Sequence, residues 1–469
     1  MIFALLENKE KIKMENNMDI LIINPGDKDS LYITEHLGIA GLKSYVIQKG
    51  FTADVLDMAI ERFDVEDAAE HIMNIEPLTI GLSLLDDTKT TGLALIKSLR
   101  EKGYRGVVIV GGYFPTFSSK KLLEDFSAIN FVVRGEGELT LAELMGVILH
   151  KSKQQLKDIK GLSYRENGEI IENAPRPLIS NLDILPEADR KYTFELINRG
   201  INIRINATRG CWGQCSFCDI SGFYKTNGGS LWRRRSVKHL VNEIEYLMYT
   251  FNQNYFIFND DQFLTKGKNA VEYVSEFARE LKNRSIKINF ELMCRADTVS
   301  RPVMSILKSA GLKKVFLGIE SFDPKQLKRF NKKITQRQNL KALILLYRMK
   351  IDVTVSIILA DAYTGFWDLI KQFIFLFELK NRYFNSPLCK ISINKKLEVY
   401  RGSPVYYEYK SKGLIKKDHY LGKITYRMKF WTALRIFLFK IEEALTIKRV
   451  MRKKRENEGT GKELSYKLN

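Results

Sequence analysis

Three cysteines close together in the chain are the residues best suited to chemistry: Cys211, Cys215 and Cys218, in the spacing C-x3-C-x2-C. Thiolates are the usual ligands of iron–sulfur clusters, and three of them can hold three irons of a 4Fe–4S cluster while the fourth iron stays open. A structural zinc site is one alternative, but it needs a fourth ligand, usually Cys or His. The closest downstream histidine, His239, lies in a predicted helix. A chance group of buried cysteines is the other alternative, and the spacing favours the cluster.

The region that carries these cysteines is predicted to alternate strands and helices. We expect strands at 203–207, 255–258, 288–293, 314–317, 353–359 and 389–393. Helical patterns separate them at 270–283, 302–310, 337–349 and 366–379. Parallel strands with crossover helices fit a partial (β/α)6 barrel, whose chemistry collects at the carboxyl ends of the strands.

The first third of the chain predicts a second sheet. Strands are expected at 20–24, 53–57, 79–82, 107–110 and 131–133, with helices at 37–49, 65–73 and 92–102. This alternation indicates a doubly wound, Rossmann-like parallel sheet, in which a ligand lies beyond the carboxyl ends of the strands. Candidate binding residues lie at those ends, where glycine lets a large ligand approach the backbone: Ser83, Gly111, Gly112, Gly135 and Glu136.

The predicted organisation of this α/β chain has four parts. Residues 18–150 form the Rossmann-like domain and residues 151–200 a linker with a hairpin at Asn167-Gly168, a pair that suits a tight turn. Residues 201–400 form the partial barrel, and residues 401–469 form a helical, basic C-terminal extension.

Composition narrows the classes of function. Five cysteines in 469 residues do not make a disulfide framework. The N-terminus lacks the apolar core and cleavage site of a signal peptide, and no apolar stretch is long enough to span a membrane, so we expect a cytoplasmic protein. The net charge of +20 comes without an aromatic ladder or zinc-finger spacing, so we expect no nucleic-acid partner.

Part of the positive charge lies near the C-terminus, after an apolar run at 430–439. This segment would contact a membrane surface peripherally or cover the mouth of the active site. The alternative is an ordinary helix with a solvated charged end.

The cysteine loop closely resembles that of the radical S-adenosylmethionine (radical SAM) enzymes. That resemblance implies that the amino and carboxylate groups of S-adenosylmethionine chelate the open iron. An electron from an external flavodoxin- or ferredoxin-type donor would then cleave the sulfonium to methionine and a 5′-deoxyadenosyl radical. Four further stretches are similar to the family: 232–236, 259–261, 291–295 and 318–321.

The same resemblance assigns cofactor-binding roles. Phe217 would pack near the adenine, and Asp260 or Asp261 would accept hydrogen bonds from the ammonium group. Arg295 would pair with the carboxylate, as arginine does bidentately. Glu320, followed by Ser321, would bond the ribose hydroxyls. The alternatives are helix caps for the aspartates, a surface ion pair for Arg295 and a structural bridge for Glu320.

The N-terminal domain resembles the cobalamin-binding domain that precedes the barrel in one branch of this family. The similar stretches are 81–83, 110–116 and 133–138. A domain of this fold that has lost its ligand is the alternative. Two departures stand out: the chain has no Asp-x-His-x-x-Gly to supply a cobalt ligand, and residues 360–364 replace the family's Gly-x-Pro-Gly-Glu-Thr.

Three functions follow from the resemblance. The first is radical methylation of an unactivated carbon in a small molecule or peptide, such as a natural-product or cofactor precursor. The second is oxidation or cyclisation without methyl transfer, as in the branch similar to anaerobic magnesium-protoporphyrin monomethyl ester cyclase. The third is a non-catalytic metal-binding or electron-transfer protein. The sequence does not decide between the first two.

Overall fold

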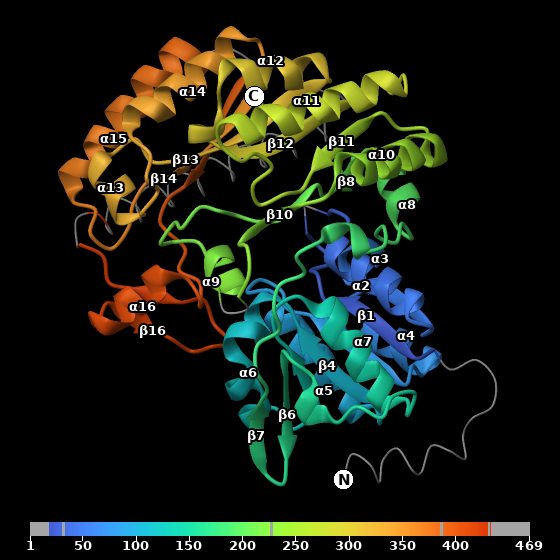
Figure 1. Cartoon of the computed structure of the whole chain (residues 1–469). Helices are drawn as coiled ribbons and strands as arrows, with labels where there is room; N and C mark the ends of the chain where they lie inside the picture. Colours follow the sequence, from blue (N-terminus) through green and yellow to red (C-terminus); the bar gives the residue numbers. More distant parts are fainter. Residues whose placement is uncertain (1–17, 31–32, 226–227, 385–387, 430–431, 433–469) are drawn as a thin grey trace, which may run out of the picture.

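The computed structural model describes residues 18–30, 33–225, 228–384, 388–429 and 432. Two α/β lobes are stacked, with the N-terminal lobe (blue to teal) below the C-terminal barrel (green to orange) in Figure 1. A small C-terminal segment lies beside the junction of the two lobes. The prediction of two successive α/β units is confirmed.

The N-terminal sheet has the strand order β2-β1-β3-β4-β5-β6-β7. Its strands are β1 (Ile20–Asn24), β2 (Ala53–Asp57), β3 (Thr79–Ser83), β4 (Val107–Gly111), β5 (Phe131–Val133), β6 (Leu162–Glu166) and β7 (Glu169–Glu172). The pairs from β2 to β5 are parallel, as predicted. One edge departs from the parallel prediction, because the hairpin β6–β7 pairs antiparallel with β5 and extends the sheet.

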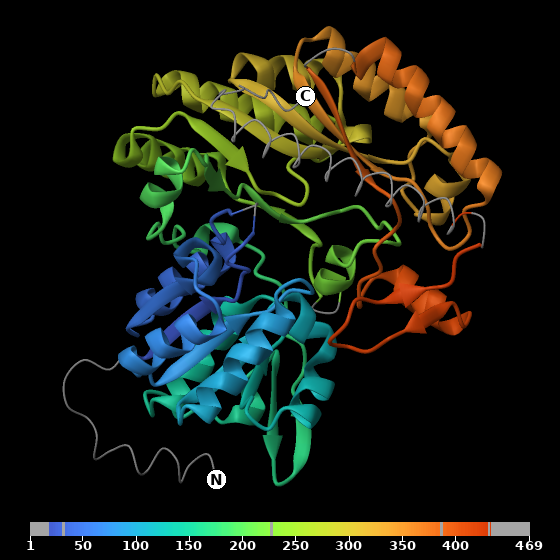
Figure 2. The same ribbon diagram turned by 180° about the vertical axis from the view of Figure 1, so that it is seen from behind.

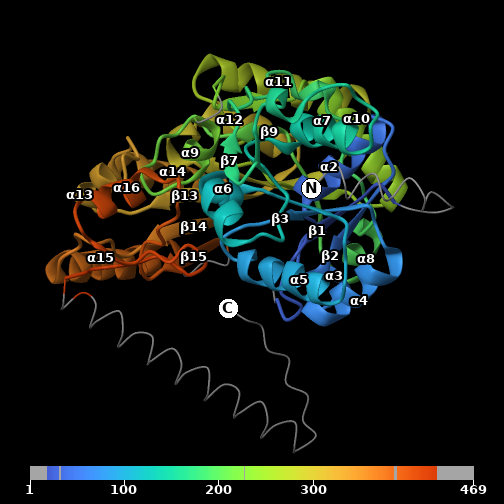
Figure 3. The same ribbon diagram turned by 90° about the horizontal axis from the view of Figure 1, so that it is seen from below.

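Helices cover both faces of this sheet, as Figure 3 shows from below. One face packs against α2 (Leu37–Gln48) and α7 (Gly137–Ile148), and the other against α4 (Val65–Ile75), α5 (Lys89–Glu101) and α6 (Tyr113–Asp125). Successive side chains of a strand point to opposite faces. Ile20 and Ile22 therefore join the first core, and Leu21 and Ile23 join the second. Burial on both faces explains the continuous apolar runs of these strands.

The barrel is a curved six-stranded sheet with helices on its outer face (Figure 2). The strands, in sheet order, are β15 (Cys389–Asn394), β14 (Asp352–Ile358), β13 (Leu312–Glu320), β12 (Asn289–Arg295), β11 (Tyr255–Phe258) and β8 (Ile203–Ile205), and all neighbours are parallel. The larger helices are α10 (Val237–Phe251), α11 (Lys268–Asn283), α12 (Arg301–Ser309), α14 (Gln336–Arg348) and α15 (Phe366–Leu379). The predicted partial barrel is confirmed.

A small antiparallel ribbon frames the cysteine loop. It pairs β9 (Thr208–Gly210), which follows β8, with β10 (Trp232–Arg234). Between them lie the three cysteines and the short helix α9 (Ile220–Lys225). The ribbon was not predicted, and it fixes both ends of the loop that carries the thiols.

The C-terminal segment contains α16 (Pro404–Ser411) and the pair β16 (Ile415–Lys417) and β17 (Thr425–Tyr426). The predicted apolar run at 430–439, Thr432 apart, and the basic tail after it lie outside the described residues. The prediction that this tail contacts a membrane therefore has no structural support. Within the described part of the chain, no helix has the length and apolar character needed to cross a bilayer.

Candidate functional site

The three cysteine thiols lie on the loop between β9 and α9. Cys215 is buried, whereas Cys211 and Cys218 are half-buried. The backbone N–H of Gly213 donates to Cys211 Sγ over 3.3 Å, and Arg295 Nη1 donates to Cys215 Sγ over 3.3 Å. Donors beside sulfur favour the thiolate, which is the form that binds iron.

Burial opposes ionisation of the Cys211 and Cys218 thiols while no metal is bound. It raises the pKa of Cys211, and it raises that of Cys218, with a further contribution from the nearby charge of Asp219. Iron must therefore displace protons when it binds. Among the described residues, no group of three or more His, Cys, Asp or Glu side chains is placed to hold one metal ion. Thiolates that ligate three separate irons of a cluster do not need to converge on one point.

Arg295 lies against the cysteine loop at the end of β12. Besides Cys215, its guanidinium donates to Asp297 Oδ1 over 3.0 Å and to the carbonyl of Lys332 over 2.6 Å. It also lies over the ring of Trp212, 4.8 Å from the centroid. The structure thus brings Arg295 to the predicted cluster, with most of its donors already engaged, and its proposed role toward the S-adenosylmethionine carboxylate remains a prediction.

Sequence reasoning missed Lys332, which links several predicted residues. This side chain is 4% exposed, and its Nζ donates to Glu320 Oε1 over 3.2 Å. It also lies 5.9 Å from the centroid of the Phe217 ring. Glu320, with a φ of +67°, also accepts from Ser356 Oγ over 3.1 Å. No sequence signal marks Lys332, because it follows α13 (Pro324–Arg329) in a turn and becomes buried only through tertiary packing.

Of the paired aspartates after β11, Asp260 is held by hydrogen bonds from the residues just before and at the start of β9. Asp260 is 3% exposed, and its Oδ1 accepts from the backbone N–H of Ala207 over 2.9 Å and from Thr208 Oγ1 over 2.8 Å. It therefore holds the bend that leads into β9. Burial raises the pKa of Asp260 to about 7 and that of Asp261 to about 6.

Ser321 is fully buried and begins the turn into α13. Its Oγ accepts from the backbone N–H of Asp323 over 3.0 Å, and Asp323 in turn caps the helix. The hydroxyl is thus engaged in local structure.

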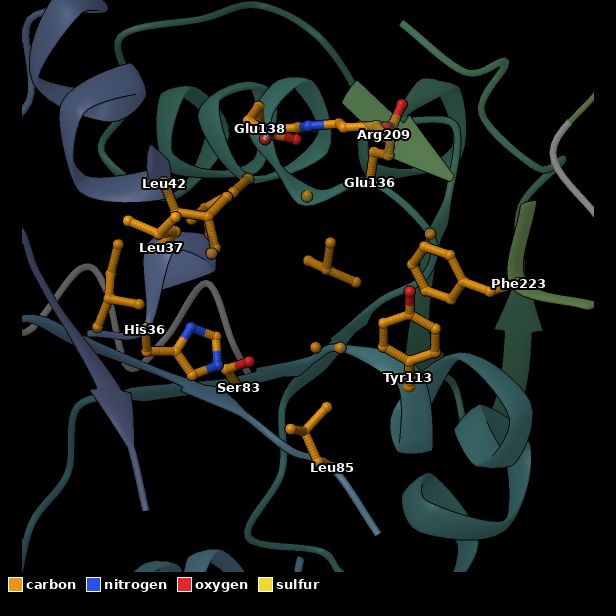
Figure 4. Close-up of a pocket in the computed structure, with 18 of the residues that line it drawn as sticks. His36, Leu37, Leu42, Ser83, Leu85, Tyr113, Glu136, Glu138, Arg209 and Phe223 are labelled. Atoms are coloured by element: carbon orange, nitrogen blue, oxygen red, sulfur yellow. Dashed lines mark hydrogen bonds and ion pairs between the residues drawn. The ribbon is translucent and has the colours of Figure 1, made fainter. Parts of the chain in front are cut away.

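A cavity of about 370 Å³ lies at the carboxyl edge of the N-terminal sheet. It is lined by every residue predicted at this edge, namely Ser83, Gly111, Gly112, Gly135 and Glu136. Figure 4 shows His36, Leu37 and Leu42 on one side of the cavity and Tyr113 and Phe223 on the other. Gly112 has a φ of +100°, and a Cβ there would lie 2.9 Å from the carbonyl oxygen of Leu84, so only glycine suits this wall.

The barrel completes this cavity. Asn206, Thr208, Arg209, Asn259 and Asp261 line it from the ends of β8 and β11 and from β9. The cavity therefore lies between the two lobes, and its walls come from both.

Buried ion pairs lock the lobes together at this cavity. Glu136 accepts from Arg233 Nη1 over 2.9 Å at both carboxylate oxygens, and Glu138 accepts from Arg209 Nη2 over 2.6 Å. The carboxylate predicted to bind a cofactor, Glu136, thus lines the cavity and is neutralised by arginines of the barrel. Both arginines lie on the ribbon that frames the cysteine loop.

Comparison with known proteins matches both lobes. Residues 205–364 match the model of the radical SAM superfamily, and residues 28–145 match the B12 binding domain. The chain carries a radical SAM domain and a B12-binding domain. These domains imply a 4Fe–4S cluster, S-adenosylmethionine and cobalamin as cofactors.

The relatives match most of this chain. An uncharacterised methyltransferase of Pyrococcus horikoshii is 29% identical over 66% of this chain and 65% of its own length. The anaerobic magnesium-protoporphyrin IX monomethyl ester cyclase of Synechocystis is 26% identical over 70% of this chain and 66% of its own. The cobalamin-dependent S-adenosylmethionine radical enzyme OxsB has a similar fold, with a TM-score of 0.72 and 22% identity over 90% of this chain and 65% of its own. The chain thus spans about two thirds of the length of these relatives.

The B12-binding domain offers a histidine that sequence reasoning missed. His36 lines the cavity at the start of α2, where its Nδ1 accepts from the backbone N–H of Ile39 over 3.3 Å. Burial lowers the pKa of His36, so the ring is neutral and Nε2 carries the proton. Because it lies outside the Asp-x-His-x-x-Gly pattern, only the fold reveals it.

The residues at both sites fit the implied cofactors. Three thiols with neighbouring hydrogen-bond donors suit a cluster, and backbone at the ends of β3, β4 and β5 without large side chains suits a flat, bulky ligand. Cys211, Cys215 and Cys218 would hold the cluster, and the glycine-lined edge with Ser83 would hold cobalamin.

A second cavity of about 280 Å³ adjoins the first. Leu85, Tyr113 and Asp261 line both cavities. The second cavity reaches Asp219 and Ile220, which directly follow Cys218. It therefore connects the B12-binding edge with the cysteine loop of the radical SAM domain.

Proposed function

We propose that this cobalamin-dependent radical SAM enzyme methylates an unactivated carbon atom of a small-molecule or peptide substrate. The observation that carries the proposal is the pair of adjoining cavities: the residues predicted to bind cobalamin line the first, and Asp219 and Ile220, which directly follow Cys218, line the second. A substrate in these cavities would reach both cofactors. The first relative in the comparison, named as a methyltransferase, supports the same reaction.

The cofactors supply the reactive groups: S-adenosylmethionine on the cluster supplies a carbon-centred radical, and cobalamin supplies a methyl group. For one product, one S-adenosylmethionine takes the substrate hydrogen and leaves as 5′-deoxyadenosine and methionine. A second gives its methyl group and leaves as S-adenosylhomocysteine. Each product requires two electrons, because the sulfonium charges of both S-adenosylmethionine molecules are lost, and an external one-electron donor supplies them one at a time.

The residues of the chain position these groups and exclude water. Glu136 and Glu138, paired with barrel arginines, hold the two cofactor-binding edges at a fixed spacing. Tyr113 stacks on Phe223, with ring centroids 4.3 Å apart, and forms an apolar wall shared by the two cavities. Such a wall excludes solvent and competing reactants from the space between the cofactors.

A reaction without methyl transfer is the second candidate. One relative is named as an anaerobic magnesium-protoporphyrin IX monomethyl ester cyclase, and its match covers 70% of this chain. The cavities suit both reactions, because each needs a substrate between the cluster and cobalamin.

The deciding experiment follows the methyl group of S-adenosylmethionine. The protein is reconstituted anaerobically with iron, sulfide and cobalamin, and then given methyl-deuterated S-adenosylmethionine and a one-electron reductant. We expect 5′-deoxyadenosine to form and the deuterated methyl group to appear on the cobalamin. 5′-Deoxyadenosine without label on cobalamin would reject methyl transfer and favour the second candidate. Cys215→Ala serves as the control that lacks the cluster.

A further inference from the structure

We infer that the second cavity accepts a substrate with a protonated amine attached to an apolar or aromatic body. This inference rests on the proposed function, because it takes this cavity as the substrate site. It names the chemical class of the substrate, which the family resemblance leaves open.

The charged groups of this cavity are mainly acidic. Asp86, Asp87, Asp219 and Asp261 line it, and Arg401 is its single basic lining residue among the described residues. Asp219 and Asp261 are partly buried and Asp87 is exposed, and none of the three forms an ion pair with a residue that the structure describes. Carboxylates in a partly buried site gain most from a cation that the ligand itself brings.

The neighbouring cations are already engaged. Lys89, whose side chain is 3% exposed, pairs with Asp86 and donates to the carbonyl of Gly422 over 3.3 Å. Arg401 pairs with Asp418 over 2.6 Å and donates to the carbonyl of Tyr420 over 3.0 Å. Both cations are already paired within the protein and are poorly placed to bind an anionic substrate. The net charge of the cavity lining therefore stays negative.

The remaining walls are apolar and largely aromatic. Tyr113, Phe114, Phe117, Ile220 and Tyr400 line the cavity together with the carboxylates. Aromatic faces attract ammonium groups as well as apolar surfaces. A hydrated anion gains from neither feature, whereas an amine beside an aromatic or aliphatic body gains from both.

A third cavity of about 200 Å³ continues from the second, with Asp86, Asp87 and Tyr400 in common. It is lined by Lys396 and Lys423 as well as Glu398. The lysines share this third cavity with Asp86 and Asp87 but do not line the second cavity, so they do not face Asp219 and Asp261, the carboxylates next to the cysteine loop.

Three probes of similar size and different charge test the inference: 2-phenylethylamine, 2-phenylethanol and 3-phenylpropionate. Binding to the reconstituted protein, loaded with cluster, cobalamin and S-adenosylmethionine, is measured by calorimetry under anaerobic conditions. We expect the amine to bind at least tenfold more tightly than the alcohol, and the carboxylate to bind most weakly. A carboxylate that binds as tightly as the amine, or an amine no tighter than the alcohol, would overturn the inference.

Two variants locate the binding. Asp87→Asn and Asp219→Asn should each weaken amine binding at least threefold and leave alcohol binding unchanged, because only the amine uses their charge. Glu101→Gln, which removes a carboxylate from an exposed pair with Lys97, is the control and should change neither. Amine affinity that is unchanged in both cavity variants would contradict the assignment.

The same samples separate this inference from the proposed function. Their iron and cobalt contents and their yields of 5′-deoxyadenosine and of label on cobalamin are measured alongside probe binding. Normal cofactor chemistry with no preference for the amine would reject the substrate class alone. An amine preference without label on cobalamin would leave the substrate class standing and reject methyl transfer.

Discussion

The two adjoining cavities differ in how their carboxylates are neutralised. In the first, Glu136 and Glu138 are paired with arginines of the opposite lobe, over 2.9 Å and 2.6 Å. In the second, Asp87 and Asp219 have no cationic partner among the described residues. Paired carboxylates hold a protein together, whereas unpaired ones remain available to a ligand. By this comparison, Glu136 and Glu138 hold the two lobes together, whereas Asp87 and Asp219 are the carboxylates to which we assign recognition of the substrate amine.

The largest effect is expected when the cysteine loop is broken. Cys218→Ala should lower bound iron and abolish 5′-deoxyadenosine formation, because a cluster corner loses its ligand. Cobalamin should still bind, since the first cavity contains no cysteine. Iron and cobalt analysis with product chromatography checks this. Cys389→Ala, a buried cysteine on β15 outside the loop, is the matched control and should retain iron.

The next largest effect is expected when the buried pair of Arg233 and Glu136 is broken, which tests whether Glu136 is structural. Arg233→Met should destabilise the fold by about 3 kcal/mol, because it leaves Glu136, 6% exposed, without its main partner. Urea unfolding followed by circular dichroism measures this change.

The double variant Arg233→Met with Glu136→Gln should recover part of that loss, since the unpaired charge is gone. Lys97→Met breaks an exposed pair with Glu101 and should change the free energy of unfolding by less than about 1 kcal/mol. Equal losses in the free energy of unfolding for Arg233→Met and Lys97→Met would contradict a structural role for the buried pair.

Filling the first cavity should have a smaller but specific effect. Ser83→Trp places a large ring at the end of β3, inside the cavity lining, and should weaken cobalamin binding at least about tenfold, or about 1.4 kcal/mol. Formation of 5′-deoxyadenosine should persist, because the cysteine loop is untouched. Absorbance titration with cobalamin gives the affinity. Unchanged cobalamin binding would place the ligand elsewhere.

The smallest effect concerns pH. Burial raises the pKa of Asp260 to about 7, above the 3.8 of an unperturbed aspartate. The folded state therefore binds this proton more tightly than the unfolded state does. The stabilisation is complete below about pH 4 and is lost as the pH rises toward 7. Asp260→Asn should flatten the fall in melting temperature between pH 5 and 7, and an unchanged slope would contradict the assignment.

Much of the architecture could be predicted because it depends on local pattern. The strands 20–24 and 53–57 and the barrel strands appear within a few residues of their predicted bounds, since continuous apolar runs mark strands buried on both faces. The three cysteines lie on one loop and the glycines at the strand ends line the first cavity, and short stretches of sequence marked both groups.

What could not be predicted depends on packing between distant segments. The hairpin β6–β7 was expected in a linker, yet it pairs with β5 because that edge of the sheet was open. Glu136 was predicted to bind a cofactor, but its pairing with an arginine 97 residues away in the chain could not be predicted. Lys332 and His36 acquire their surroundings only when separate elements meet, so no spacing rule identifies them.

The most direct test compares the products that the protein forms from S-adenosylmethionine with and without cobalamin. Reconstituted protein is given S-adenosylmethionine and a one-electron reductant, and 5′-deoxyadenosine and S-adenosylhomocysteine are quantified together. The account predicts 5′-deoxyadenosine in both samples and S-adenosylhomocysteine only in the sample that contains cobalamin. Cluster-loaded protein that forms no 5′-deoxyadenosine, or cobalamin-loaded protein that never forms S-adenosylhomocysteine, would contradict it.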